Sequence, residues 1–186
     1  IRSRQPEFRD EKRARYKEEY GIPQYDIDII TSEKKLADLF EETIALGCRP
    51  KEVSNWLMVE TMRLLKEQDM DAADIRFSPA HLAALIGLVE QGKINRTVAK
   101  EVFEVMFEQD VDPVSYVEEK GLSMVQDEGA LRSTIEEIVK NNPQSVEDYR
   151  SGKKKAMGFL VGQTMKAMKG KADPALVNKI LLEILG

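Results

Sequence analysis

The sequence predicts an all-α protein built from two consecutive multi-helical bundles, and three observations support this. Patterns of period two, which mark strands, are nearly absent, and only residues 24–30 alternate briefly between apolar and acidic side chains. Helical patterns with start and stop residues recur about every 15 to 20 residues. The 186 residues are 42% hydrophobic and 33% charged, which is enough apolar material to bury cores. We expect about ten helices, in a helical domain of residues 1–110 and a smaller domain of residues 111–186.

The first half of the helical domain is predicted to contain three helices. Residues 6–20 are highly charged and indicate a solvated helix that ends at Gly21. Ser32 is placed to cap the next helix. Pro50 begins a third helix, whose apolar residues cover much of its circumference, so we expect it to lie at the centre of its bundle.

Two further helices complete this domain. Ser78 and Pro79 are an N-cap followed by proline at the first helical position, and Gly92 stops that helix. Asn95 begins the last one. The domain boundary is placed at residues 109–113, a short acidic segment with a helix-starting proline.

The second domain is predicted to contain five helical segments. Residues 113–120 form a short helix, Asp127 caps a longer one, and residues 145–150 make about one turn. Residues 154–169 form a helix that stops at a glycine, and Asp173, followed by proline, caps the last helix.

Charge is distributed unevenly along the chain. The net charge is −5, which excludes a protein that coats nucleic acid over its whole surface. Between Arg150 and Lys171, however, there are seven basic residues and no acid. At 100° per residue, the lysines of the helix at 154–169 fall opposite its methionine-rich apolar side. Six of the seven basic residues are lysine, which favours contacts with a phosphate backbone over base reading.

Two glycines, Gly158 and Gly162, lie in the same helix. Each costs a helix about 1 kcal/mol relative to alanine, so their presence indicates that another backbone approaches closely. Two interpretations remain open. The approaching backbone belongs either to a nucleic acid or to a partner helix, and in the second case the lysines only keep the surface soluble.

Several kinds of chemistry are not supported by the sequence. The single Cys48 and the single His81 provide neither a disulfide framework nor a zinc site, so we expect no catalytic residue and no metal site. The Gly152-Lys153 pair lacks the earlier glycine and the hydroxyl residue of a phosphate-binding loop. No apolar run is long enough to cross a membrane, which favours a cytoplasmic location. The chain begins with Ile1, and we expect it to be part of a longer protein.

The segment from Gly152 to Ala172 also carries a recognisable motif. It reads Gly-Lys-Lys-Lys-Ala-Met-Gly-Phe-Leu-Val-Gly-Gln, followed by Met-Lys and later by Gly-Lys-Ala. It resembles the C-terminal tail of the B-subunit family of aspartyl/glutamyl-tRNA amidotransferases. Upstream segments resemble the family's helical region in the same order: residues 10–16, 19–21, 51 with 55–56, 82–83 with 85–86, 99–100 with 102–103, and 142–143 with 148–150.

The resemblance implies a function. Proteins of this family carry an N-terminal cradle domain with the ATP-dependent chemistry, then a helical domain, then a tail domain related to stand-alone YqeY-type proteins. The chain would be the C-terminal, tRNA-binding and non-catalytic part of a ligase complex that includes the A and C subunits of the amidotransferase. That complex converts misacylated Glu-tRNA(Gln) or Asp-tRNA(Asn) to the amide form, with glutamine as nitrogen donor. The resemblance implies no cofactor in this part, and it places ATP and Mg in the N-terminal domain.

The resemblance also implies which residues contact tRNA, and it implies no partnership with DNA or membranes. Where the family often has asparagine before the last proline, this chain has Asp173, which makes a phosphate contact at that position doubtful. The alternative is a helical protein–protein interaction module, as in a stand-alone YqeY-like protein. The candidate tRNA-binding residues are Lys153, Lys154, Lys155, Lys166, Lys169 and Lys171, together with Gly158 and Gly162.

Overall fold

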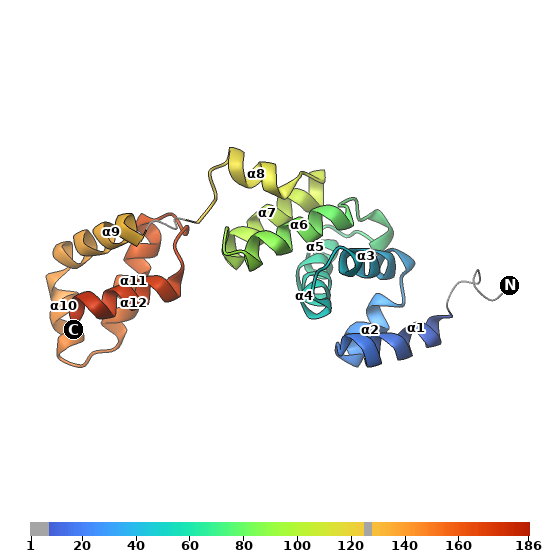
Figure 1. Ribbon diagram of the computed structural model, residues 1–186, viewed down its shortest axis with the longest axis horizontal. Coiled ribbons are helices and arrows are strands. Elements are labelled where there is room, and N and C mark those ends of the chain that lie inside the picture. The colour runs from blue at the N-terminus through green and yellow to red at the C-terminus, as the bar shows by residue number, and fades with distance from the viewer. Residues whose placement is uncertain (1–7, 125–127) are drawn as a thin grey trace. The chain divides into compact units, whose positions relative to one another are not determined.

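All regular secondary structure is helical in the part of the chain that the computed structural model describes, residues 8–124 and 128–186 (Figure 1). These ranges contain no strand, which confirms the all-α prediction. The chain divides into two compact units. Unit 1 runs to Glu90 and also includes Lys100–Tyr116, whereas unit 2 comprises Gln91–Ala99 and Val117–Gly186. The domain boundary expected after residue 110 stays a prediction.

The helices follow one another with short connections. Within the described ranges, none combines the length and the apolar character that a membrane span needs. The residue ranges of the two units divide α7 and α8 between them. The α-helices are α1 (Arg9–Arg15), α2 (Gln24–Ile30), α3 (Lys34–Ala45), α4 (Pro50–Asn55), α5 (Met62–Glu67), α6 (Pro79–Glu90), α7 (Arg96–Gln109), α8 (Pro113–Glu119), α9 (Glu128–Asn141), α10 (Pro143–Arg150), α11 (Lys155–Ala167) and α12 (Pro174–Leu185). Two π-helical turns, η2 (Tyr16–Tyr20) and η3 (Trp56–Thr61), and one 3₁₀ turn, η4 (Ala72–Asp74), complete the set.

The caps predicted at Ser78 and Asp173 form as expected, and Asn95, which was predicted to begin a helix, caps it as well. The side-chain oxygens of Ser78, Asn95 and Asp173 each accept a hydrogen bond from a backbone N–H two or three residues later, at 3.2, 2.8 and 2.8 Å. Each bond satisfies one of the N–H groups that a helix start leaves without a partner. The cap predicted at Asp127 lies outside the described residues.

The segment with the brief alternating pattern is helix α2. Ile27 and Ile30, three residues apart, lie on one side of this helix and are both fully buried. The cap predicted at Ser32 is wrong, because the Ser32 hydroxyl donates to the carbonyl oxygen of Ile29 at 2.7 Å and so closes α2. Glu33 occupies the N-cap position of α3, without a side-chain hydrogen bond.

The helix predicted to begin at Pro50 runs without a break through α4, η3 and α5. Its middle turn is π-helical, with the Thr61 hydroxyl donating to the carbonyl oxygen of Trp56 at 3.1 Å. The same turn buries Glu60, whose carboxylate forms ion pairs with Lys100 at 2.8 Å and with Arg63 at 3.3 Å. A buried carboxylate needs such partners. Arg63 lies one turn further along the same helix, whereas Lys100 comes from α7, which the sequence pattern does not relate to this helix.

Trp56 also anchors the aromatic core of unit 1. Its ring lies 5.2 Å from that of Phe103, which in turn lies 5.3 Å from the ring of Phe77. All three side chains are buried, and such aromatic pairs contribute about 0.5–1.5 kcal/mol each beyond the area they bury. The helix that contains Trp56 therefore contributes to this core, and its central position stays a prediction.

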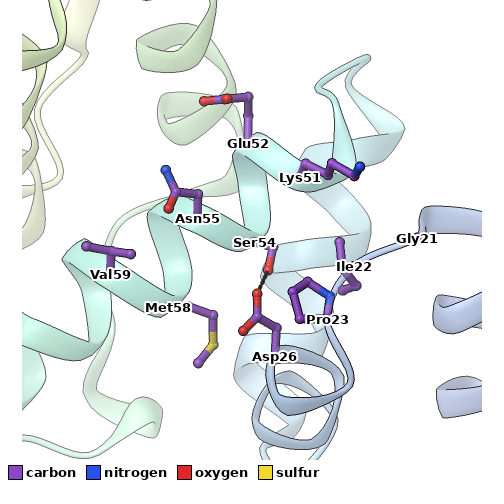
Figure 2. Close-up of a pocket in the computed structure, with 10 residues that line it drawn as sticks. All are labelled: Gly21, Ile22, Pro23, Asp26, Lys51, Glu52, Ser54, Asn55, Met58 and Val59. Carbon is purple, nitrogen blue, oxygen red and sulfur yellow. Dashed lines mark hydrogen bonds between the residues drawn. The ribbon is translucent and has the colours of Figure 1, made fainter.

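A hollow of about 600 Å³ lies beside α4 in unit 1 (Figure 2). Lys51 and Asn55, two residues of the family-like pattern, line it from one side. On the other side, Asp26 of α2 accepts a hydrogen bond from the Ser54 hydroxyl at 2.8 Å. This bond ties α2 to α4.

The prediction of a solvated first helix is wrong for one of its sides. Tyr16 is fully buried, and its ring lies 5.0 Å from that of Phe40 on α3. Tyr20 also packs on Phe40, at 5.6 Å. The predicted stop at Gly21 is confirmed, since this residue adopts φ +57°, which glycine takes without strain.

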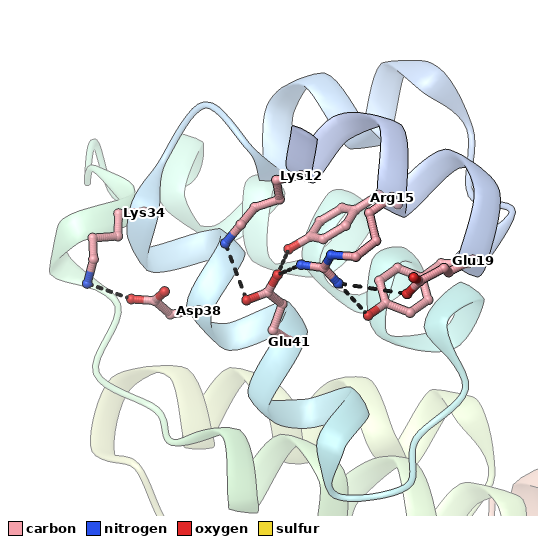
Figure 3. Close-up of polar contacts among 8 residues, drawn as sticks. Lys12, Arg15, Glu19, Lys34, Asp38 and Glu41 are labelled. Carbon is pink, nitrogen blue, oxygen red and sulfur yellow. Dashed lines mark hydrogen bonds and ion pairs between the residues drawn. The ribbon is translucent and has the colours of Figure 1, made fainter. Parts of the chain in front are cut away.

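Glu41 of α3 binds the first helix through three side chains (Figure 3). Its carboxylate contacts Arg15 at 2.5 Å and Lys12 at 3.3 Å, and accepts from the Tyr16 hydroxyl at 2.9 Å. Burial opposes ionisation of Glu41, but the hydrogen bonds from Arg15 and Tyr16 hold its pKa below the usual value. Burial and the Glu41 carboxylate raise the pKa of Tyr16. The charges that made the helix look solvated therefore attach it to unit 1.

In unit 2, helices α9, α11 and α12 pack on one another around a separate core (Figure 1). Helix α10 is longer than the single turn predicted, because it begins at Pro143, a residue suited to the first helical position. The fully or almost fully buried members of this core are Leu131, Ile135, Leu160, Ala172, Val177, Ile180, Leu181 and Leu185.

Candidate nucleic-acid interface

Helix α11 is oriented by its apolar side. Leu160 and Thr164 are fully buried, and the Thr164 hydroxyl donates to the Leu160 carbonyl oxygen at 2.9 Å, which satisfies it away from water. The side chains that pack around them on the core of unit 2 are Met157, Val161, Met165 and Met168. The apolar side predicted from the helical period is therefore confirmed.

The opposite side of α11 faces solvent. At 100° per residue, positions 155, 158, 159, 162 and 166 gather on one side of the helix, and position 169 follows just beyond its end. All of these residues are exposed. We call this surface the lysine face: Lys155, Gly158, Phe159, Gly162, Lys166 and Lys169.

The two glycines of the lysine face border open space. A Cβ atom built on Gly158 or Gly162 would meet no atom within 4 Å beyond the adjoining helix itself. Packing against other described parts of the chain therefore does not account for these glycines. A stretch of bare helical backbone is left accessible to a partner.

The six lysines proposed to bind tRNA fall into two groups. Lys153 forms an ion pair with Asp148 at 2.9 Å, which lowers the pKa of Asp148, and the Lys171 ammonium donates to the carbonyl oxygen of Gly121. Lys154, Lys155, Lys166 and Lys169 are exposed, and none of them pairs with an acid in the described ranges. These four are the cations available to an external anion. Their role in binding, like that of Lys153 and Lys171, stays a prediction.

The turn after α11 holds Lys169 in place. Lys169 itself has φ +52°, a left-handed conformation that is uncommon for a side chain other than glycine, and Gly170 follows at φ +73°. The Gly170 carbonyl oxygen accepts a hydrogen bond from the Asn95 side chain at 2.5 Å. Asn95 also caps α7, so one amide serves both as a helix cap and as a restraint on this turn.

Phe159 also lies on the lysine face, although it is not among the candidate residues that the sequence predicted. Its side chain is 47% exposed, although the helix that carries it buries other apolar residues. Its position four residues after Lys155 and three before Gly162 puts it on the lysine face, and the helical period alone identifies it as lying outside the apolar stripe.

The single histidine and the single cysteine take part in local contacts in unit 1. His81 Nδ1 lies 2.7 Å from the carboxylate of Asp110, which also accepts from the backbone N–H of Ser78 at 2.9 Å. Cys48 is half-buried, and burial together with Glu90 raises the pKa of its thiol. A raised pKa disfavours the reactive thiolate.

The absence of a cofactor and of a metal site from this chain stays a prediction. No three acidic, histidine or cysteine side chains in these ranges lie close enough to share a metal ion. Lys153, which follows Gly152 in the segment compared above with a phosphate-binding loop, forms an ion pair with Asp148.

Comparison with known proteins covers almost the whole chain. The family described as the GatB domain matches residues 38–185. The chain is similar to the B subunit of the aspartyl/glutamyl-tRNA(Asn/Gln) amidotransferase of Lachnoclostridium phytofermentans, at 62% identity over 185 residues, and to that of Agathobacter rectalis, at 60% over 185 residues. The protein of the same name from Geobacillus kaustophilus is 49% identical over 186 residues. Each comparison covers 100% of this chain and 39% of the relative, so the chain spans about two fifths of their length.

Proposed function

Because this chain belongs to the GatB domain family of amidotransferase B subunits, we propose that it holds tRNA for an amidotransferase through the lysine face. In this proposal the tRNA is misacylated Glu-tRNA(Gln) or Asp-tRNA(Asn), and the complete ligase, with its A and C subunits in the cytoplasm, converts it to the amide form. The residues of this chain take no part in the bond-forming steps. ATP and Mg act elsewhere in the complex.

The observation that supports tRNA binding most directly is the free lysine face. Lys155, Lys166 and Lys169 follow one side of α11 and its end, and no described acid neutralises them. In a chain of net charge −5, this is a local cationic surface on an acidic molecule. A polyanion would be attracted to this surface and repelled by much of the remainder.

The chemistry of the face sets the kind of contact. Lysine ammonium groups bind phosphates as point charges, whereas base reading typically uses the planar fork of arginine. Gly158 and Gly162 leave room for a sugar-phosphate chain to come close to the helix. The face should therefore position tRNA without reading its sequence, and the affinity should fall steeply with salt.

A direct test measures tRNA binding by the full chain at several salt concentrations. Replacing the four free lysines by glutamine should lower the affinity at low salt and reduce the slope of log affinity against log salt by about 3, since each phosphate contact contributes roughly 0.7–0.9. The matched control replaces four exposed lysines outside α11, which changes the net charge equally and should leave the slope nearly unchanged. The test set is Lys154, Lys155, Lys166 and Lys169, and the control set is Lys17, Lys35, Lys66 and Lys140.

A second candidate function is supported by the exposed apolar ring and the bare glycines. Phe159, with Gly158 and Gly162 beside it, also suits the close approach of a partner helix. In that case the lysines only solubilise the surface, and the affinity for tRNA would show a nearly flat salt dependence. An unchanged slope in the test variant would favour this alternative and overturn the tRNA proposal.

A further inference from the structure

We propose that Phe159 is a stacking platform for one unpaired base of the bound RNA, so that the lysine face selects single-stranded or looped RNA over a continuous duplex. This inference rests on the proposed function and extends it. It concerns a residue that a binding mode based on phosphate contacts alone would not use.

The ring of Phe159 lies beside the lysines of α11. A single exposed apolar residue is common on protein surfaces and needs no explanation by itself. Phe159, however, lies on the lysine face, with a 47% exposed side chain within α11. Its neighbours along the helix are Lys155 one turn before it and Lys166 two turns after it. The ring therefore lies among the cations that would hold a phosphate chain.

The two glycines beside the ring of Phe159 leave space around it. Residues three or four apart are neighbours on a helix, so the side chain at position 162 would lie beside the ring of Phe159. That position is Gly162, and the space where its Cβ would be is open. Gly158, next to Phe159 in the chain, is open in the same way. A planar group that approaches over these two positions therefore meets no side chain from either of them.

The lysines around the ring indicate which kind of planar group would bind there. Charge complementarity points to an anion, because every charged side chain on this face is a lysine without a described acidic partner. A nucleotide joins a planar base, through a sugar, to a phosphate, so it offers both a flat group for the ring and an anion for the lysines. Bases stack on exposed aromatic rings in single-stranded RNA, where every base has a free face, whereas in a continuous duplex the bases are covered by their neighbours.

The experiment compares two RNA probes and uses the full chain. One probe is an unstructured oligouridylate of twelve nucleotides, and the other is a twelve-base-pair RNA duplex. Phe159→Leu keeps an apolar side chain but removes the ring, and it should weaken oligouridylate binding by about fivefold or more, in the range known for base–aromatic stacking. Binding of the duplex should stay within about twofold of the unchanged chain.

A fluorescent variant provides a second measurement. Phe159→Trp should retain binding, and its emission should be quenched by oligouridylate, because the indole stacks on a base. The natural Trp56 is buried in unit 1, so the unchanged chain supplies the baseline signal. As a matched control, Leu182→Ala removes an equally exposed apolar side chain from α12, and it should affect neither probe.

The outcomes separate this inference from the proposed function. Equal effects of Phe159→Leu on both probes, or no effect on either, would overturn stacking. If the lysine variant weakens both probes at the same time, RNA binding by the face stands while the stacking role is lost. If the lysine variant has no effect on either probe, the proposed function itself fails.

Discussion

Replacing Gly158 and Gly162 by alanine should stabilise the protein and weaken RNA binding. Both glycines lie inside α11, neither has a positive φ, and a Cβ at either position meets open space. Alanine is better than glycine in a helix interior by about 0.5–1 kcal/mol, because it reduces the freedom of the unfolded chain. The double variant should therefore gain about 1–2 kcal/mol in the unfolding of unit 2. For a unit of this size, that corresponds to a melting temperature about 4–16 °C higher.

The assay is thermal and urea denaturation of the full chain, followed by circular dichroism. The transition of unit 2 is the one expected to move, and α11 should show stronger protection against amide hydrogen exchange. The same variant should bind tRNA more weakly, because two methyl groups then occupy the space over the exposed backbone. A gain in stability together with a loss of binding would be the trade-off expected of a functional surface.

Gly152 offers a control of opposite sign. Its surroundings are equally open, but its φ is +93°, so Gly152→Ala should destabilise unit 2 although it meets no steric obstacle. A double variant at Gly158 and Gly162 that is less stable than the unchanged chain would refute the argument from helix propensity. Unchanged tRNA affinity in a stabilised variant would show that RNA does not approach these glycines.

Three further predictions concern the two units. Glu41 has a lowered pKa in the folded protein, so its ionised form stabilises unit 1 above about pH 4.5, and this contribution is lost as the pH falls through the folded pKa. Glu41→Gln should therefore flatten the acid dependence of the urea midpoint between pH 3 and 7. An unaltered profile would contradict the role assigned to Glu41. Asp173→Ala should cost about 1 kcal/mol by removing the cap of α12, whereas Asp173→Asn, which keeps a capping oxygen, should cost much less by the same urea assay. Leu160→Ala should destabilise unit 2 by about 2–5 kcal/mol, because a fully buried side chain leaves a cavity; a loss below 1 kcal/mol would mean that this side of α11 is not core.

Local features of the chain were predictable because their causes lie within a few residues. The caps at Ser78, Asn95 and Asp173 depend only on a short polar side chain and the backbone just after it. The cap prediction at Ser32 was wrong for a different reason. Ser32 lies between α2 and α3, and its hydroxyl donates to the last turn of α2 instead of capping α3. Both options lie within a few residues of Ser32, so the residue pattern alone does not choose between them.

The lysine face was likewise predictable in part. The helical period alone separated the apolar side of α11 from its lysines, but it did not predict that Lys153 and Lys171 have partners within the chain. Asp148 and Gly121 engage Lys153 and Lys171, and only the fold brings Gly121 to Lys171 across 50 residues of sequence.

By itself, the sequence determined that the protein is helical, where most of its helices begin and end, and which side of α11 faces solvent, because short-range hydrogen bonds and the 3.6-residue period settle these features. Tertiary structure alone decided that Tyr16 is buried against Glu41, that Glu60 pairs with Lys100, and that Gly158 and Gly162 border open space. These features depend on atoms that are distant in the chain, and no local pattern encodes the distances between them.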